Sequence, residues 1–303
     1  MHQVLFSIRS FALHTYGVLI ALGFLIGIVL AAREARRVGQ SQERMLDLCF
    51  WILVSGLVGS RILYILTNLS DYVATCREGI ASGSRRELIW KCSAALHVWE
   101  GGLVYYGGFL GALLVVLWYV RRHQMPFLRN ADVLAPSLAI GHFFGRLGCW
   151  AAGCCFGKVC QLSWGARFPP GSLAFDDLAG RGMVPPGAQV TPSLHPTQLY
   201  EAGGELIIFF VLLALRRRKR YDGQVLLGYL FLYPLLRTVV ELFRGDAARK
   251  FLWQLATPRL NALLGLAPGQ PVVLSTSQFL SLLLAGSALA LMLGLRRRHR
   301  FAP

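Results

Sequence analysis

The chain has 303 residues, of which 55% are hydrophobic and 15% are charged, and its mean hydropathy is +0.51. This composition is typical of a polytopic membrane protein and excludes an ordinary soluble globule. The formal net charge is +16, but the basic residues cluster at the ends of apolar runs, where they orient helices and contact anionic head groups. The charge therefore does not indicate nucleic-acid binding.

Seven apolar runs are long enough, or nearly so, to cross about 30 Å of hydrocarbon as helices. They cover residues 16–32, 45–68, 102–120, 133–152, 199–215, 224–243 and 272–295, and the fifth is the shortest. We therefore predict an all-α polytopic membrane protein in which residues 1–303 form a single bundle of seven transmembrane helices.

Short basic clusters follow the first, third, fifth and seventh runs, whereas the loops after the other runs are longer and carry basic residues more sparsely. The positive-inside rule then predicts an N-terminus outside and a C-terminus in the cytoplasm. Segments 69–100, 153–198 and 244–271 are the predicted outside parts, which we expect to form a small head and interfacial pieces. The first run carries its charges after the apolar core, so we predict a retained helix rather than a signal peptide.

Glycines crowd the second, third and fourth runs, which indicates close helix packing because small residues let backbones approach in lipid. Two pairs, 101–102 and 107–108, flank Tyr105 and Tyr106. Paired glycines also free a backbone to bend toward a ligand, so both interpretations stay open for this segment.

Three arginines lie inside stretches that otherwise have the composition of membrane helices, namely Arg61, Arg146 and Arg237. An arginine near the middle of a bilayer costs at least ~2.5–3.5 kcal/mol on insertion scales, so it faces a partner or a polar cavity. Three in one chain predict a buried polar site, most simply one that holds an anion. The commonest anion at a membrane is a phospholipid phosphate.

In the sixth run, Tyr233, Arg237 and Glu241 follow one another at intervals of four residues, which places them on one helical face. They form either an internal ion pair or a functional stripe. We favour the stripe, because burying an ion pair is often no more stabilising than a hydrophobic isostere.

In the fourth run, Arg146 shares a face with His142 and Cys149 but has no carboxylate within one turn. Its partner must come from another helix, from the cavity or from a bound anion. The forked donors of arginine suit phosphate. Because like charges repel in a low dielectric, a clamp made of Arg146 and Arg237 implies an anionic guest between them.

The cysteines form two groups. Cys76 and Cys92 share one predicted outside loop, where an oxidising compartment permits a disulfide. The second group consists of Cys149, Cys154, Cys155 and Cys160. Its spacing is not that of a paired zinc knuckle, so we favour a disulfide among the last three cysteines and predict no metal.

Five segments together resemble the prolipoprotein diacylglyceryl transferases of bacterial inner membranes, along nearly the whole chain. They are Leu13-His14-Thr15-Tyr16-Gly17, Val98-Trp99-Glu100-Gly101-Gly102-Leu103, Gly145-Arg146-Leu147-Gly148 continuing to Gly157, His195-Pro196-Thr197-Gln198-Leu199-Tyr200-Glu201, and Tyr233 through Arg244. The resemblance implies a multi-pass inner-membrane protein of seven helices with a periplasmic head and a cavity open sideways to lipid.

The resemblance also implies an activity. The diacylglyceryl group of phosphatidylglycerol would pass to the lipobox cysteine thiol of a preprolipoprotein, with release of glycerol phosphate and without a cofactor. By position, Arg146 and Arg237 would hold the lipid phosphate. The predicted catalytic residues are Arg146, Arg237, Tyr106 and Glu241, and the predicted substrate-binding residues are Tyr16, His14, Tyr233, Gly157, Gly101, Gly102 and Arg61.

The chain departs from the family pattern at the position of the usual catalytic base. The family often has a histidine where Tyr106 stands, and that histidine is a usual candidate for activating the thiol. Tyr106, His14 and His195 stay open as proton acceptors. The family also often has Asn and Glu where Cys149 and Cys154 stand.

Two rival functions remain. A transporter or lipid-binding protein also has charged residues facing its interior, although this chain lacks the repeated halves common in transporters. A catalytically altered relative of the transferase would explain the tyrosine at position 106.

Overall fold

The structure is a computed structural model, and it describes residues 4–8, 11–97, 101–245, 258–264 and 275–301. The chain divides into two compact units, which we describe separately. Unit 1 comprises Met1–Glu34 with Leu128–Pro303, and unit 2 comprises Ala35–Phe127. The single bundle over residues 1–303 stays a prediction.

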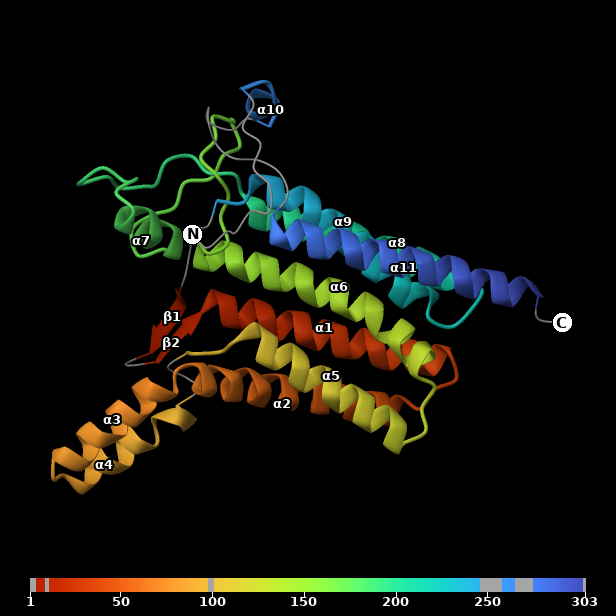
Figure 1. Ribbon diagram of the computed structural model, residues 1–303, viewed down its shortest axis with the longest axis horizontal. Coiled ribbons are helices and arrows are strands. Elements are labelled where there is room, and N and C mark those ends of the chain that lie inside the picture. Colours follow the sequence, from red (N-terminus) through yellow and green to blue (C-terminus); the bar gives the residue numbers. More distant parts are fainter. Residues whose placement is uncertain (1–3, 9–10, 98–100, 246–257, 265–274, 302–303) are drawn as a thin grey trace. The chain divides into compact units, whose positions relative to one another are not determined.

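Unit 1 holds the hairpin and most of the helices (Figure 1). Its elements are β1 (Val4–Ile8), β2 (Phe11–His14), α1 (Thr15–Arg37, whose last turn enters unit 2), α6 (Phe127–Ala152, which begins at the end of unit 2), α7 (Leu173–Gly180), α8 (Thr197–Arg217), α9 (Gln224–Phe243), α10 (Pro258–Leu263) and α11 (Thr276–Phe301). Unit 2 contains α2 (Gln42–Thr67), α3 (Leu69–Ala81), α4 (Arg85–Cys92), a 3₁₀ turn (Ala94–Leu96) and α5 (Tyr105–Arg122).

Each of the seven predicted runs contains a helix, and the described residues are helical apart from the antiparallel β1–β2 hairpin and isolated bridges, none of which we predicted. Five of the described helices are long and apolar enough to cross a membrane, namely α1, α2, α8, α9 and α11. The crossing of α5 and α6, and the orientation of the termini, stay predictions.

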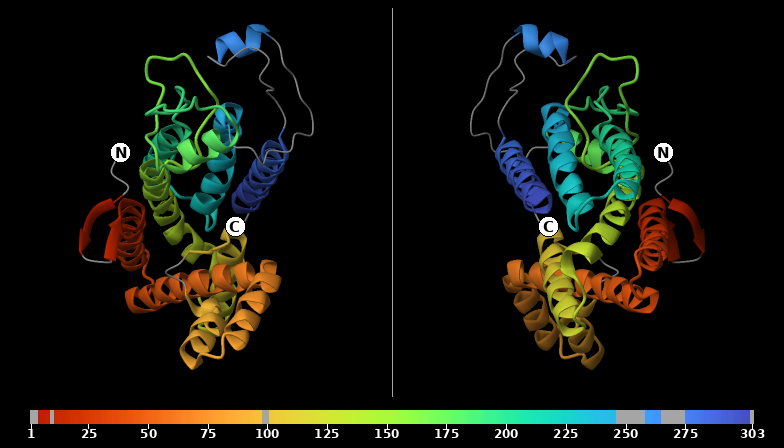
Figure 2. Two further views of the ribbon diagram at one scale, coloured as in Figure 1. Left: turned by 90° about the vertical axis from the view of Figure 1, so that its left-hand side faces the viewer. Right: turned by 90° about the vertical axis from the view of Figure 1, so that its right-hand side faces the viewer.

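Helices α6, α8 and α9 enclose the main core of unit 1, and α9 packs against both α8 and α11 (Figure 2). The core residues are Ala135, Ala139 and Ile140 of α6, Ile208, Phe209 and Leu212 of α8, and Val225 and Tyr229 of α9. Gly204 makes room for Leu236 where α8 and α9 meet, because a Cβ there would lie 2.3 Å from Leu236 Cδ1 and the leucine would have to shift.

A buried carboxylate of α6 fixes the start of α9. Asp132 accepts hydrogen bonds from the backbone N–H groups of Gly223, Val225 and Leu226 at 2.8, 2.9 and 2.9 Å, and it pairs with Lys219 at 3.1 Å. The first N–H groups of a helix lack partners within the helix and carry partial positive charge, so a carboxylate there is stabilising. The cap sets the position of α9 against α6.

Segment 153–198 is mostly irregular, as predicted from its turn residues, apart from α7. We call it the head, and its position outside the membrane stays a prediction. It has a second core made of Phe156, Ala166, Phe168, Ala174, Leu178 and Leu194. Isolated β-bridges join Leu194 to Val159 and to Ala166. Of the predicted outside segment 244–271, residues 246–257 and 265–271 lie outside the described residues.

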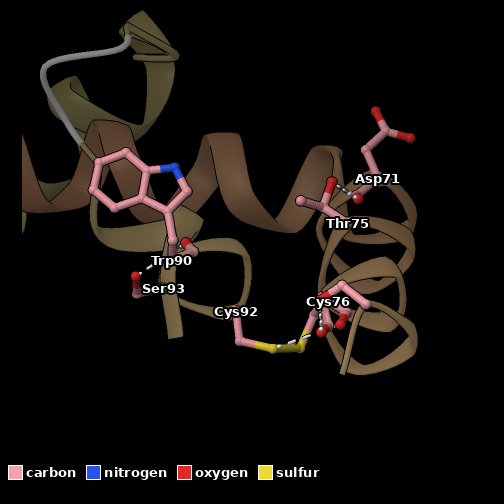
Figure 3. The surroundings of a disulfide bond; sticks show 8 residues. Asp71, Thr75, Cys76, Trp90, Cys92 and Ser93 are labelled. Carbon is pink, nitrogen blue, oxygen red and sulfur yellow. Dashed lines mark hydrogen bonds between the residues drawn. A yellow bond between two sulfur atoms is a disulfide. The ribbon is translucent and has the colours of Figure 1, made fainter. Parts of the chain in front are cut away.

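In unit 2, glycines bring α2 and α5 into backbone contact, which confirms close packing as their role. A Cβ on Gly59 would lie 2.4 Å from Gly107 O, and a Cβ on Gly111 would lie 2.5 Å from Ser55 O. Cys76 and Cys92, for which the sequence permitted a disulfide, form one that joins α3 to the end of α4 (Figure 3).

We expect Gly107→Ala to destabilise unit 2, because the added Cβ would lie 2.3 Å from Gly59 O on the neighbouring backbone. Overpacking of this kind costs about 1–3 kcal/mol. Thermal unfolding of the purified protein in detergent measures the loss. Gly286→Ala on α11 is the matched control, since nothing lies within 4 Å of a Cβ at that position. Equal stability of the two variants would contradict the packing role.

Candidate functional site

Charged side chains from three helices of unit 1 converge on one cluster. Helix α6 contributes His142 and Arg146, α8 contributes Glu201 and Glu205, and α9 contributes Arg237 and Glu241. Each pair on one helix is four residues apart, so its two side chains lie on the same face. The helix packing described above turns these three faces toward one another.

Glu201 is the centre of the cluster and is only 1% exposed. Its Oε1 lies 2.9 Å from Arg146 Nη2, and its Oε2 lies 3.7 Å from Arg237 Nη1. The expected convergence of these two arginines is therefore confirmed. The argument that they require an anionic guest between them is wrong, because a carboxylate of the chain itself already balances their repulsion.

The face of α9 forms an internal ion pair, the alternative that we ranked below a functional stripe. Arg237 Nη2 lies 2.9 Å from Glu241 Oε2, and Ser275 Oγ donates to the other oxygen of Glu241 at 3.0 Å. Gln278 Nε2 donates to Thr238 O at 3.1 Å, which ties α11 to the same part of α9. The Arg237 guanidinium is thus held from two sides, by α8 and by its own helix.

His142 and Glu205 form a second, closer pair beside the arginines. His142 Nδ1 lies 2.7 Å from Glu205 Oε1, and Arg146 Nε donates to His142 Nε2 at 3.4 Å. Because Nε2 accepts from Arg146, a neutral His142 ring carries its proton on Nδ1, the nitrogen that faces Glu205. The Tyr233 ring lies against the imidazole, with ring centroids 4.9 Å apart.

Our site prediction from the sequence omitted Glu201, Glu205 and His142. A signal for all three existed in the spacing, because Glu201 and Glu205 are four residues apart within an apolar run, as are His142 and Arg146. Two carboxylates on one face of a membrane helix are costly unless cations face them. That cost indicates that the carboxylates of α8 pair with the unpaired arginine of α6.

The cluster is not sealed from its surroundings. The side chains of Arg146, Arg237 and His142 are 15%, 16% and 26% exposed. Beside Arg146, a Cβ on Gly145 or on Gly141 would meet nothing within 4 Å. Each of these three side chains is therefore partly exposed.

Tyr16 packs against the same helix just beyond the cluster. A Cβ on Gly148 would lie 3.0 Å from Tyr16 Cδ2, so the glycine makes room for the tyrosine ring. Tyr16 also interacts electrostatically with Arg146 and with the nearby cysteines. His14, at the end of β2, is exposed.

The cysteines near the end of α6 do not form the predicted disulfide. Cys149, Cys154 and Cys155 are free thiols whose sulfur atoms all lie within 4.8 Å of one another. Cys160 is also free and lies apart from them, with its sulfur 3.9 Å from Ser193 Oγ. The pairing failed because the head core buries Cys160 elsewhere.

The close sulfur atoms differ in acidity. Hydrogen bonds with Cys149 and Cys154 lower the pKa of Cys155, and the positive charges of Arg244 and Arg146 lower it further. The pKa of Cys154 is raised, because its thiol proton is shared with Cys149 and Cys155 and because it is partly buried.

Packing explains two further residues, namely Gly157, which we predicted to bind substrate, and His195, which stayed open as a proton acceptor. A Cβ on Gly157 would lie 2.5 Å from His195 Cβ and 2.7 Å from Phe243 O, so only glycine fits between the head and the end of α9. His195 is buried, and its Nδ1 lies 3.2 Å from the Tyr200 hydroxyl. Their roles in substrate binding and proton transfer stay predictions.

Arg61 belongs to unit 2, where backbone carbonyls surround it. It donates to Gly101 O at 2.6 Å, to Gly102 O at 3.2 Å and to Ala94 O at 2.9 Å. Gly102 has a φ of +74° and contacts the guanidinium closely, which explains why this turn needs glycine. Arg61 thus stabilises the connection before α5.

Tyr106, at the start of α5, is 71% exposed and packs edge-to-face on Tyr105. Substrate contacts of Arg61, Gly101 and Gly102, and catalysis by Tyr106, stay predictions. Residues 98–100 of the motif at 98–103 lie outside the described residues.

Comparison with known proteins identifies relatives along the whole chain. The family model "Prolipoprotein diacylglyceryl transferase" matches residues 3–294. The phosphatidylglycerol–prolipoprotein diacylglyceryl transferase of Clostridium tetani is 27% identical over 93% of this chain and 93% of its own length. The enzyme of the same name from Geobacter sulfurreducens is 32% identical, over 81% of this chain and 83% of its own. That of Thermotoga maritima is 31% identical, over 82% and 76%.

We expect Glu201→Gln to lower the thermal stability markedly, because two guanidinium groups then repel each other without a shared carboxylate. Breaking a buried ion pair from one side costs about 3–5 kcal/mol. The double variant Glu201→Gln with Arg146→Gln should regain part of the loss, since one cation is removed. Thermal unfolding in detergent measures both, with Glu78→Gln on exposed α3 as the control. Additive losses in the double variant would contradict the shared role of Glu201.

Proposed function

This chain belongs to the prolipoprotein diacylglyceryl transferase family, and we propose that the charged cluster of α6, α8 and α9 is its catalytic site. The protein is a membrane transferase. It transfers the diacylglyceryl group of phosphatidylglycerol to the cysteine thiol of a prolipoprotein, forming a thioether and releasing glycerol phosphate. The observation that carries the site assignment is the meeting of Arg146 and Arg237 on Glu201.

Arg146 and Arg237 hold the lipid phosphate in this proposal. A guanidinium has five N–H donors, and the contacts with Glu201, His142 and Glu241 engage only part of them. Glu201 allows the two cations to stay close together, and both side chains are partly exposed. A phosphodiester that approaches from the lipid therefore meets two guanidinium groups that are already in position to donate hydrogen bonds to it.

His142 is the proton acceptor that the geometry favours. Glu205 fixes its ring through Nδ1 and stabilises the imidazolium that forms when Nε2 takes a proton. This is the arrangement by which a carboxylate orients a catalytic histidine in hydrolase triads. Of the three acceptors left open by the sequence, Tyr106 is 71% exposed, His14 lies before α1, and His195 is buried in the head beside the Tyr200 hydroxyl.

The reaction follows from these roles. His142 Nε2 takes the proton of the substrate thiol, and the thiolate sulfur attacks the glycerol carbon that bears the phosphate. The C–S bond forms as the C–O bond breaks, and the bonding electrons move to the departing phosphate oxygen. Arg146 and Arg237 stabilise the charge that develops there. His142 then passes the proton that it took from the thiol to the departing phosphate or to water.

We infer an inner-membrane location with the N-terminus outside. Disulfides persist on the oxidising side of a membrane, so the Cys76–Cys92 bond favours an outside position for α3 and α4. The basic clusters favour the same orientation, because they follow runs that would end in the cytoplasm. Two independent chemical signals thus support one orientation.

We expect Arg146→Ala and Arg237→Ala each to reduce lipid transfer by at least about 10²-fold, because each removes donors from the developing phosphate charge. The assay uses the purified protein, labelled phosphatidylglycerol and a lipobox peptide, with the thioether product measured. Arg129→Ala, at an exposed pair with Asp222, is the control. Normal turnover in either cluster variant would refute the clamp, and lipid binding without transfer by the unaltered protein would support the rival lipid-binding function.

We expect His142→Gln to reduce transfer by about 10²–10⁴-fold at pH 7, because a general base contributes that much. Raising the pH to about 9.5 should restore much of the rate, since a free cysteine thiol with a pKa of about 8.5 then ionises without help. Glu205→Gln should behave similarly but with a smaller loss. His123→Gln, at the residue just after α5, is the control. A loss in His142→Gln that high pH does not relieve would indicate a structural role instead.

A further inference from the structure

Three thiols converge just beyond the arginine cluster, and the proposed reaction does not use them. Cys149 lies in the last turn of α6, and Cys154 and Cys155 lie in the loop that follows. All three sulfur atoms lie within 4.8 Å of one another and are partly buried. The chain forms a disulfide at Cys76 and Cys92, but these three thiols remain reduced although they are close together.

The backbone takes an unfavourable conformation to bring them together. Gly153 has a φ of +73°, and Cys155 has a φ of +59°. A residue with a side chain pays roughly 1–2 kcal/mol to adopt the left-handed region. Strain of this kind persists where the surrounding structure enforces it, and it is common at binding sites.

Two buried residues at the start of α8 hold the loop in this conformation. Thr197 Oγ1 donates to Cys155 O at 2.8 Å, and Gln198 Nε2 donates to Cys154 O at 2.7 Å. The backbone N–H of Cys154 also donates to Cys149 O at 3.1 Å. The positions of the sulfur atoms are therefore fixed by groups other than the thiols themselves, as the outer contacts of metal sites fix their ligands.

Packing and disulfide formation do not account for this arrangement. Apolar packing requires no convergence of three sulfur atoms, and a disulfide would use only two of them. Three thiolates and a divalent cation carry a net charge of −1. Arg146, one turn before Cys149, and Arg244 both interact electrostatically with Cys155, so positive charge is available to balance it.

We propose that Cys149, Cys154 and Cys155 bind one divalent thiophilic cation of the zinc class through three thiolate ligands. With zinc–sulfur bonds of about 2.3 Å, sulfur atoms around a tetrahedral ion lie about 3.8 Å apart, so shifts of about 1 Å would close the site. Three protein ligands leave a fourth position open. The sequence did not indicate this site, because its spacing differs from a zinc knuckle and only the left-handed turn brings Cys155 back toward Cys149.

The test uses the full-length protein in detergent, stripped of metal under anaerobic conditions without a reductant so that the Cys76–Cys92 disulfide stays closed, and titrated with Cd²⁺ and Zn²⁺. We expect one Cd²⁺ per chain with sulfur-to-metal charge-transfer absorption, and a higher unfolding temperature with Zn²⁺. Cys149→Ser, Cys154→Ser and Cys155→Ser should each weaken binding at least about tenfold. Cys160→Ser is the matched control, because its sulfur lies apart beside Ser193, and it should bind normally.

Absence of charge-transfer absorption would overturn the proposal, as would equal weakening in Cys160→Ser. A cysteine variant that has lost binding must keep the unfolding temperature of the metal-free parent, and if a serine variant unfolds, the alanine variant at the same position replaces it. Because lipid transfer is not a readout of this experiment, a negative result leaves the proposed transferase function untouched. Loss of transfer in the arginine variants would likewise leave the metal site standing.

Discussion

The site depends on one carboxylate that serves two cations. A buried guanidinium is tolerable only beside a compensating charge, and two of them near each other raise the cost further. Glu201 supplies the compensating charge for both guanidinium groups, because one of its oxygens faces Arg146 and the other faces Arg237. A single carboxylate thus keeps two phosphate-binding groups close, charged and partly exposed.

Helix packing places that carboxylate between its partners. The Asp132 cap positions the start of α9 against α6, and Gly204 makes room for Leu236 where α8 and α9 meet. The pairs on each helix repeat every four residues, so a small rotation of any of the three helices would separate them. The electrostatics of the site and the apolar core of unit 1 are therefore parts of one arrangement.

Sequence patterns predicted the features that lie within one helix or one short segment. The apolar runs predicted the helices, the interval between Arg237 and Glu241 gave their pairing as one of two alternatives, and the shared loop of Cys76 and Cys92 permitted the disulfide. We did not predict the partner of Arg146. The paired carboxylates of α8 indicate that cations face them, but which side chains pair between helices depends on the relative rotation of the helices. The same reason hid the His142–Glu205 pair, which joins residues far apart in the sequence.

The first turn of α8 has several attachments at once. Thr197 and Gln198 hold the cysteine loop, Tyr200 contacts His195 in the head, and Glu201 holds both arginines. One inserted or deleted residue in this turn would rotate everything after it by about 100° and break these contacts together. Evolution can therefore exchange side chains here more readily than it can alter the length of the segment, and homologues should show a gap-free block from Pro196 to Glu201.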